Sequence, residues 1–255
     1  MTRLRISLRP TLIPALALLL VGAVLVALGP ARVSASPRRP AVIGVERIGA
    51  SVVGRPIYAY HVGDPKARLT VVLMATMHGD EPAPRRILLS LRDGAPVTGV
   101  NLWLIPTVNP DGLARRTRRN AHHVDLNRNF PWRWKRLYGN YNSGRSPASE
   151  PETRALIGFF KQVHPRYVVS FHQPLHGVDT STRKSRHFAR RLAAALNLPR
   201  KRLVCGGVCH GTFTEWFNHK YAGVAITVEY GSHPSRHRMR VAAPRQLLRL
   251  FGGHR

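Results

Sequence analysis

Cysteine is almost absent from this chain of 255 residues. Its two cysteines, Cys205 and Cys209, lie in one Cys-Gly-Gly-Val-Cys segment. A zinc site built on cysteine is disfavoured, because the nearby His210 is too close in sequence to complete a convincing four-ligand set. In an oxidising compartment the pair favours a short-loop disulfide, and two free thiols are the alternative.

Internal repeats and long linkers are also lacking. Their absence argues against a repeat protein and, at this length, predicts one domain with a sizeable core. A hydrophobic content of 44% excludes wholesale disorder. We place this domain at residues 43–255, after a short tether at residues 36–42.

The first 35 residues differ in kind from the rest. Arg3, Arg5 and Arg9 precede the apolar stretch Leu12–Leu28, and Val33-Ser34-Ala35 forms a small-x-small cleavage pattern. This order predicts a secretory signal peptide over residues 1–35, with an uncleaved membrane anchor as the alternative. Either interpretation places the domain outside the cytoplasm, secreted or in the cell envelope.

Acidic residues are scarce: 12 aspartates and glutamates stand against 40 lysines and arginines, a formal net charge of +28. Residues 1–35 hold four arginines and no acids, so the remainder keeps a charge of +24. Such a surface attracts polyanions, and an exported protein meets anionic envelope polymers and lipid headgroups before nucleic acid. A solvated basic surface without any such partner is the alternative.

Apolar, β-branched segments alternate with helix-like segments from residue 43 onward. This alternation predicts an α/β domain whose largely parallel sheet is flanked by helices. The expected strands are Arg55–His61, Leu69–Met77, Gly99–Val108, Arg166–His172, Arg202–Gly206 and Gly223–Tyr230. The expected helices are Pro82–Leu91, Glu150–Gln162, Arg183–Leu196, Gly211–Lys220 and Ala243–Phe251. The long polar section between them, residues 109–150, is of a length that is usually functional.

Three of these strands end in residues that can bind or catalyse. His78 and Glu81 follow the strand Leu69–Met77, and His172 and Glu229 stand at the ends of two later strands. Singly, His172 suits a hydrogen-bonded core histidine and Glu229 a structural ion pair. Because ligands collect at the carboxyl ends of strands, the four together suggest a catalytic zinc site with a separate carboxylate for proton transfer.

Five ordered motifs over residues 70–230 give the chain a family resemblance. The motifs are His78-Gly-Asp-Glu81, Asn109-Pro-Asp-Gly112, Val124-Asp-Leu-Asn-Arg-Asn-Phe-Pro131, Ser143-Gly-x-x-Pro147 leading into Ser149-Glu-Pro-Glu152, and Ser170-Phe-His172 with Ile226-Thr-Val-Glu229. With these motifs the chain resembles the zinc carboxypeptidase family of the carboxypeptidase A type, and within it the small bacterial murein peptide amidases, which share the spacing of Arg118 and Asn120 before Val124-Asp125.

The resemblance implies one Zn²⁺ per chain, held by His78, Glu81 and His172. It makes Glu229 the general base and then the general acid. Asp125 corresponds to the family's acid behind the first ligand, and would orient His78 by accepting its free ring N–H.

The resemblance also implies a substrate carboxylate held by Asn127 and Arg128, and an oxyanion stabilised by Arg118. Arg118 is chosen among four crowded arginines by its offset from Asp125, and a shift of one residue would select Arg119 instead. An arginine fork fits a carboxylate in a two-pronged manner that lysine does not match.

The chain departs from the large carboxypeptidases at two places. Asp80 stands where they have an arginine, and the segment 205–210 has no tyrosine where they carry a substrate-facing one. Thr214 and Glu215 match positions that line the side-chain pocket, where an acid would suit the basic or amphoteric side chain of diaminopimelate. Aromatic and basic residues alternate around Trp132, Tyr138 and Tyr141, and for these we expect a packed loop at the rim of the cleft rather than a nucleic-acid or glycan platform.

We therefore expect an exported zinc metallopeptidase that hydrolyses an amide bond next to a free carboxylate. Its expected substrate is a murein-derived peptide, cut at the γ-D-glutamyl–diaminopimelate bond. An ordinary protein metallocarboxypeptidase is the alternative among enzymes. A basic envelope- or nucleic-acid-binding protein on an inactive scaffold is the alternative from another class.

Overall fold

The computed structural model describes residues 39–255. The predicted signal segment and the start of the tether lie outside the described residues. Within residues 39–255, no helix is both long enough and apolar enough to cross a membrane.

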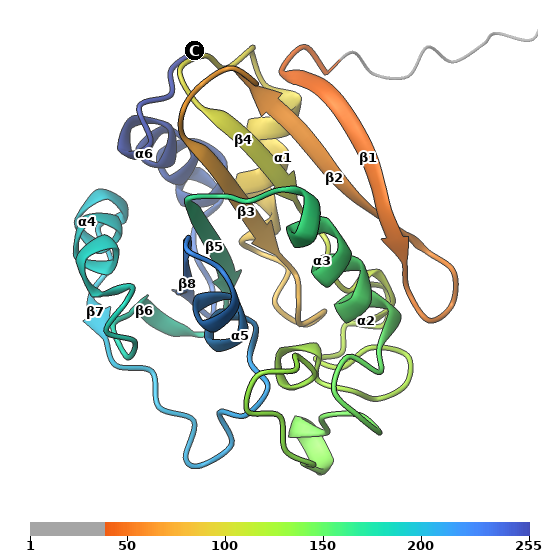
Figure 1. Cartoon of the computed structure of the whole chain (residues 1–255). Coiled ribbons are helices and arrows are strands. Elements are labelled where there is room, and N and C mark those ends of the chain that lie inside the picture. Colours follow the sequence, from red (N-terminus) through yellow and green to blue (C-terminus); the bar gives the residue numbers. More distant parts are fainter. Residues whose placement is uncertain (1–38) are drawn as a thin grey trace, which may run out of the picture. The chain divides into compact units, whose positions relative to one another are not determined.

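The described chain is built on one eight-stranded mixed sheet (Figure 1). The strands lie side by side in the order β1-β2-β4-β3-β5-β8-β6-β7. Pairing is parallel between β4, β3, β5 and β8 in the centre, and between β6 and β7. It is antiparallel where β1, β2 and β4 meet and between β8 and β6. The strands are β1 (Val42–Ala50), β2 (Pro56–Gly63), β3 (Thr70–Ala75), β4 (Asn101–Ile105), β5 (Tyr167–His172), β6 (Leu175–Asp179), β7 (Arg200–Lys201) and β8 (Val224–Gly231).

Residues 39–255 contain six α-helices, of which all but the short α2 cover the two faces of this sheet (Figure 1). They are α1 (Arg85–Asp93), α2 (Pro110–Arg115), α3 (Pro151–Gln162), α4 (Arg186–Leu196), α5 (Phe213–Lys220) and α6 (Ala243–Leu250). Local sequence explains several helix starts: Pro151 opens α3, and the Thr212 hydroxyl accepts a hydrogen bond from the Glu215 amide at the start of α5. Short turns also occur at η1 (Leu126–Arg128), η2 (Gly139–Tyr141) and the π-helical η3 (Arg238–Ala242).

The predicted fold class is confirmed, with corrections at the sheet edges. The strand expected at Arg202–Gly206 is wrong, because β7 ends at Lys201 and Gly206 and Gly207 adopt positive φ angles of 53° and 88°. Strands β1 and β6 and helix α2 were not expected from the sequence. β1 begins at Val42, one residue before the expected start of the domain.

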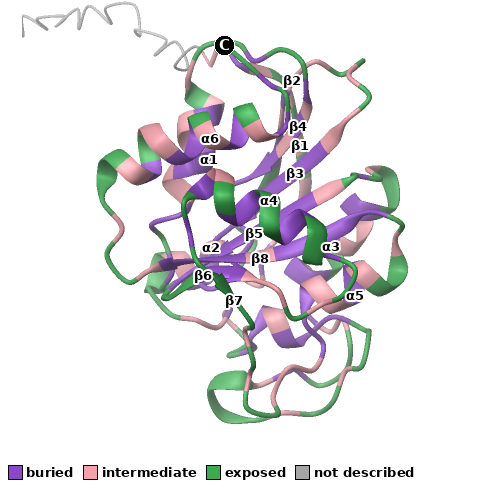
Figure 2. Cartoon of the chain, turned by 90° about the vertical axis from the view of Figure 1, so that its left-hand side faces the viewer, coloured by how far each residue is buried: buried purple, intermediate pink, exposed green. Residues whose placement is uncertain are grey.

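Hydrophobic side chains form two cores, one on each face of the sheet. One core joins α1, α4 and α6 to the sheet through residues such as Leu88, Leu192 and Leu247. The other joins α3 and α5 to it through Phe160 and Phe217. The central strands are buried along most of their length (Figure 2). Backbone at their ends is therefore held rigidly, which suits a site that needs fixed geometry.

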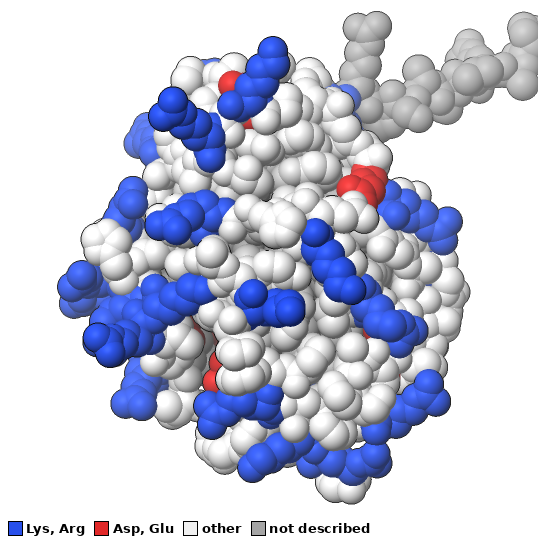
Figure 3. Space-filling view, viewed as in Figure 1, with Lys and Arg blue, Asp and Glu red and all other residues white. Residues whose placement is uncertain are grey.

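Basic side chains are spread over the face seen in Figure 3, with few acidic side chains among them. On this face the positive charge is distributed rather than gathered in one place. Attraction to anionic envelope polymers therefore stays a prediction from net charge.

Candidate metal centre and active site

The predicted site residues come together at the carboxyl ends of β3, β5 and β8. His78 lies three residues beyond β3, and His172 is the last residue of β5. Glu229 on β8 is the direct register partner of His172. Adjacent parallel strands thus deliver an imidazole and a carboxylate to the same edge of the sheet.

A glycine makes the turn after β3 possible. A Cβ on Gly79 would lie 1.9 Å from the carbonyl carbon of Gly112, so no larger residue fits there without moving the backbone. The Gly79 amide also donates to the Thr117 carbonyl at 3.0 Å. The motifs His78-Gly-Asp-Glu81 and Asn109-Pro-Asp-Gly112 are therefore packed directly against each other.

Three buried donor groups converge here. Nδ1 of His78 lies 2.7 Å from Glu81 Oε1, Nδ1 of His172 lies 2.8 Å from Glu81 Oε2, and the two Nδ1 atoms are 3.2 Å apart. Within residues 39–255, this is the one group of three or more histidine, cysteine or acidic side chains placed to share a metal ion. Two imidazoles and one carboxylate form a donor set typical of catalytic zinc, so the residues present fit that ion.

Electrostatics bind this cluster together. Burial favours the neutral imidazole of His78, but the carboxylates of Glu81 and Asp125 outweigh it and raise the pKa of His78 to about 9. Burial likewise opposes the charged form of Glu81, yet His78 and His172 hold its pKa well below the usual range. The site therefore concentrates negative charge around two imidazoles, as a cation site requires.

Asp125 lies behind the cluster and is fully buried. Its Oδ1 is 3.1 Å from Nε2 of His78, the nitrogen that faces away from Glu81. Its Oδ2 accepts two hydrogen bonds from the Arg118 fork, at 3.0 and 2.8 Å from Nε and Nη2. Burial would raise the pKa of Asp125, but His78 and Arg118 lower it well below its ordinary value.

Arg118 points its remaining nitrogen at the same cluster. Nη1 lies 3.3 Å from Nδ1 of His78 and 3.6 Å from Oε1 of Glu81. The neighbouring Arg119 is half-buried and donates to the Gly139 carbonyl instead. The structure thus places Arg118, and not Arg119, where a guanidinium could face an oxyanion.

Glu229 is 92% buried, since its relative exposure is 8%, and it lines the same cavity. Its Oε2 accepts a hydrogen bond from the Leu175 amide at 3.3 Å. Burial raises the pKa of Glu229 despite the opposing influence of His172. A carboxylate with a raised pKa is suited to accept and return a proton near neutral pH.

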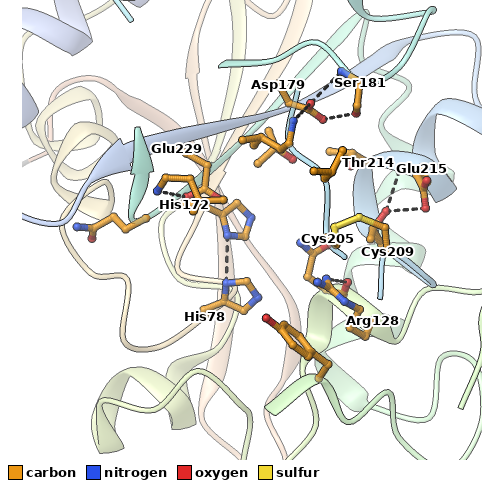
Figure 4. A pocket seen from close by; sticks show the side chains of 18 of the residues that line it. His78, Arg128, His172, Asp179, Ser181, Cys205, Cys209, Thr214, Glu215 and Glu229 are labelled. Atoms are coloured by element: carbon orange, nitrogen blue, oxygen red, sulfur yellow. Dashed lines mark hydrogen bonds between the residues drawn. A yellow bond between two sulfur atoms is a disulfide. The ribbon is translucent and has the colours of Figure 1, made fainter. Parts of the chain in front are cut away.

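The cavity in front of these groups has a volume of about 540 Å³. His78 and His172 lie on one side of it, and Arg128, Thr214 and Glu215 on the other (Figure 4). Glu215 accepts a hydrogen bond from the Thr212 hydroxyl at 3.2 Å. The structure therefore gathers every predicted metal, catalytic and substrate-binding residue around one space, with Asp125 behind it.

Asn127 and Arg128 line that space. Arg128 is buried, its Nη1 donates to the Asn127 carbonyl at 2.7 Å, and its Nε, which is itself shielded, has no partner within the described chain. Asn127 uses its side-chain oxygen to accept from the Phe213 amide at 2.9 Å. A buried guanidinium with unused donors is a suitable partner for a carboxylate.

Sequence reasoning missed several residues of the cavity wall. Cys205 and Cys209 form a disulfide, as the favoured prediction had it, but both also line the cavity. Tyr141 lines it too, from the loop that was expected at the rim of the cleft. Asp179 also lines it, and nothing in the sequence pattern indicated this residue.

Comparisons with known proteins agree with this geometry. A family model described as zinc carboxypeptidase matches residues 34–177. Murein peptide amidase A of Escherichia coli K12 is 33% identical over 188 residues, which cover 68% of this chain and 76% of that protein. The crystal structure of the murein-tripeptide amidase of Escherichia coli O157 has a TM-score of 0.69 at 29% identity, covering 84% of this chain and 93% of that one. The carboxypeptidase A of Helicoverpa armigera, at 17% identity, shares the fold with a TM-score of 0.68, covering 84% of this chain and 68% of that one.

Proposed function

The chain belongs to the zinc carboxypeptidase family and is a zinc-dependent hydrolase, and we propose that it is a murein peptide amidase. Its substrate in this proposal is a murein-derived peptide, cleaved at the γ-D-glutamyl–diaminopimelate bond. One observation carries the proposal: the donor set of His78, Glu81 and His172 shares a cavity with Glu229 and Arg128. Likeness to murein peptide amidases over two thirds of the chain supports the choice of substrate.

His78, Glu81 and His172 would hold one zinc ion. When bound, the ion supplies polarisation of the scissile carbonyl and a lowered pKa for the attacking water. Asp125 keeps the His78 ring in the orientation that presents Nδ1, since Oδ1 lies 3.1 Å from the opposite nitrogen.

Glu229 moves the protons in this proposal. It takes a proton from the attacking water and returns one to the leaving amine, so the side chain ends the cycle as it began. Its burial supports this role, because a raised pKa keeps both protonation states accessible.

Two arginines would each contact a different negatively charged group of the substrate. Arg118, with Nη1 directed at the metal cluster, would stabilise the developing oxyanion. Arg128 would hold the free carboxylate with its unused donors, assisted by Asn127. One well-placed donor to an oxyanion contributes about 3–4 kcal/mol of transition-state stabilisation in comparable sites.

The cavity wall opposite the metal ligands would select the side chain of the substrate. Glu215 would attract the second amino group of diaminopimelate, with Thr214 beside it in the cavity. Diaminopimelate carries a positive and a negative charge at that end, so an acid favours it over an apolar side chain.

We also propose that the protein acts outside the cytoplasm. The apolar N-terminal segment is the reason, and the disulfide between Cys205 and Cys209 supports it, because such bonds persist in oxidising compartments. The excess of positive charge would then hold the enzyme near anionic envelope polymers.

The test compares two substrates. The murein tripeptide L-alanyl-γ-D-glutamyl-meso-diaminopimelate and a hippuryl-type dipeptide are offered to the zinc-loaded protein under the same conditions. The proposal expects a higher kcat/KM for the tripeptide. A clear preference for the dipeptide would instead identify an ordinary metallocarboxypeptidase.

A further inference from the structure

Tyr141 contacts both arginines of the site from a separate loop. The carbon at the centre of the Arg128 guanidinium lies 5.2 Å from the centroid of the Tyr141 ring, and that of Arg118 lies 5.5 Å from it. Tyr141 is 41% exposed and lines the cavity. One aromatic ring thus packs against the cation proposed for the oxyanion and the cation proposed for the carboxylate.

The two guanidiniums are held differently without the ring. Arg118 is held by its fork on Asp125. Arg128 is buried, and within the described chain its side chain makes a single hydrogen bond, to the neighbouring Asn127 carbonyl. Burial and the positive charge of Arg118 both disfavour its charged form and lower the pKa of Arg128. The negative face of an aromatic ring offsets that cost without consuming a hydrogen-bond donor.

The loop that carries Tyr141 is fixed to the site. The Asp125 amide donates to the Asn142 carbonyl at 2.8 Å, and the Asn142 side chain donates to the His123 carbonyl at 2.9 Å. Tyr141 is therefore tied, through its neighbour, to the residue that holds both His78 and Arg118. The ring is placed by the same backbone that places the metal cluster.

We propose that Tyr141 is a positioning residue that acts chiefly through Arg128 and thereby sets the affinity for the substrate carboxylate. This inference rests on the proposed role of Arg128. In this proposal the face of the Tyr141 ring contacts the guanidiniums, and the hydroxyl plays no part. It also places an aromatic ring against the arginines of the cavity, although the segment 205–210, which also lines the cavity, lacks a tyrosine.

The experiment compares three variants: Tyr141→Leu, Tyr141→Phe and Tyr138→Leu. Tyr138 is the matched control, because it precedes the same short turn, is 75% exposed and does not line the cavity. KM and kcat are measured with the murein tripeptide or the hippuryl-type dipeptide, whichever the wild type cleaves. Either substrate serves, because both carry a free carboxylate. Zinc content is measured for every variant.

The proposal expects Tyr141→Leu to raise KM by about five- to thirty-fold, the equivalent of losing one or two cation–π contacts, with a smaller change in kcat and unchanged zinc. Tyr141→Phe should restore most of the affinity, and Tyr138→Leu should match the wild type. An unchanged KM in Tyr141→Leu, or an equal loss in Tyr141→Phe, would overturn it. Cleavage of the dipeptide alone would refute the murein substrate and leave the Tyr141 comparison intact.

Discussion

Nε2 of His78 lies 3.1 Å from Oδ1 of Asp125, on the side of the ring opposite Glu81. This contact decides which ring nitrogen is free to ligate. It also explains why a carboxylate that touches no substrate is completely buried at the centre of the site. A ligand held from behind in this way loses little freedom when it binds a metal.

Replacing that carboxylate should weaken the metal site. We predict that Asp125→Asn lowers zinc affinity by about 10- to 100-fold, because the amide no longer provides a charged acceptor for the His78 ring. Competition with a chelator of known affinity measures the effect. Asp93→Asn is the control, since Asp93 lies on the surface at the end of α1. Equal zinc affinity in Asp125→Asn and wild type would refute the orienting role.

Glu215 should control the choice of side chain next to the scissile bond. We predict that Glu215→Gln lowers kcat/KM for the diaminopimelate peptide by about tenfold or more, because a charged hydrogen bond is lost. The hydrogen bond from Thr212 can still be accepted by the amide oxygen, so the start of α5 should survive. A substrate ranking unchanged from the wild type would show that Glu215 does not contact the substrate.

The disulfide should affect substrate binding rather than zinc retention. Cys205 and Cys209 line the cavity, but neither belongs to the metal cluster. We predict that the double variant Cys205→Ser/Cys209→Ser keeps its zinc and raises KM several-fold, because its loop loses a covalent constraint. Reduction of the wild type should have the same effect, and thiol titration confirms the state of the bond. Identical KM values for oxidised and reduced enzyme would contradict this prediction.

Stability in acid should depend on Asp111, which does not line the active-site cavity. This buried carboxylate accepts hydrogen bonds from the Ser51 hydroxyl, the Val53 amide and the Arg55 guanidinium. Burial opposes its charged form, but these donors lower its pKa in the folded state. A depressed folded pKa gives stability that is complete above the unfolded value, about 4, and is lost as the pH falls through the folded value.

We therefore predict that the free energy of unfolding decreases as the pH falls below about 4, and that Asp111→Asn removes part of this dependence. At pH 7 the variant should lose about 1–3 kcal/mol of stability, because three donors lose a charged acceptor. Urea titrations over a series of pH values measure both effects. Parallel pH profiles for variant and wild type would show that Asp111 does not contribute.

The central strands and the ligands were predictable because both follow local rules. β3, β5 and β8 are apolar runs, and His78, His172 and Glu229 are the polar residues at or just after their ends. β1 was missed because it is an edge strand with alternating half-exposed residues, and β6 because its sequence Leu-His-Gly-Val-Asp contains no apolar run.

The walls of the cavity could not be predicted in the same way. Tyr141 contacts Arg118 and Arg128 only because a long loop returns to the site, and no spacing in the sequence encodes that path. The expectation of a packed loop was wrong for Tyr138, whose side chain is 75% exposed. The disulfide was expected from compartment and spacing, but its place in the cavity wall depends on how the loop after β7 folds back.

The most direct test measures zinc content and turnover of the murein tripeptide for wild type and Glu229→Gln side by side. We predict about one zinc per chain in both proteins, activity abolished by chelator in the wild type, and a kcat about 100- to 10,000-fold lower in the variant. That result would separate metal binding from proton transfer, as the geometry requires. A Glu229→Gln variant that turns over the tripeptide like the wild type, or a wild type that is active without zinc, would contradict the account.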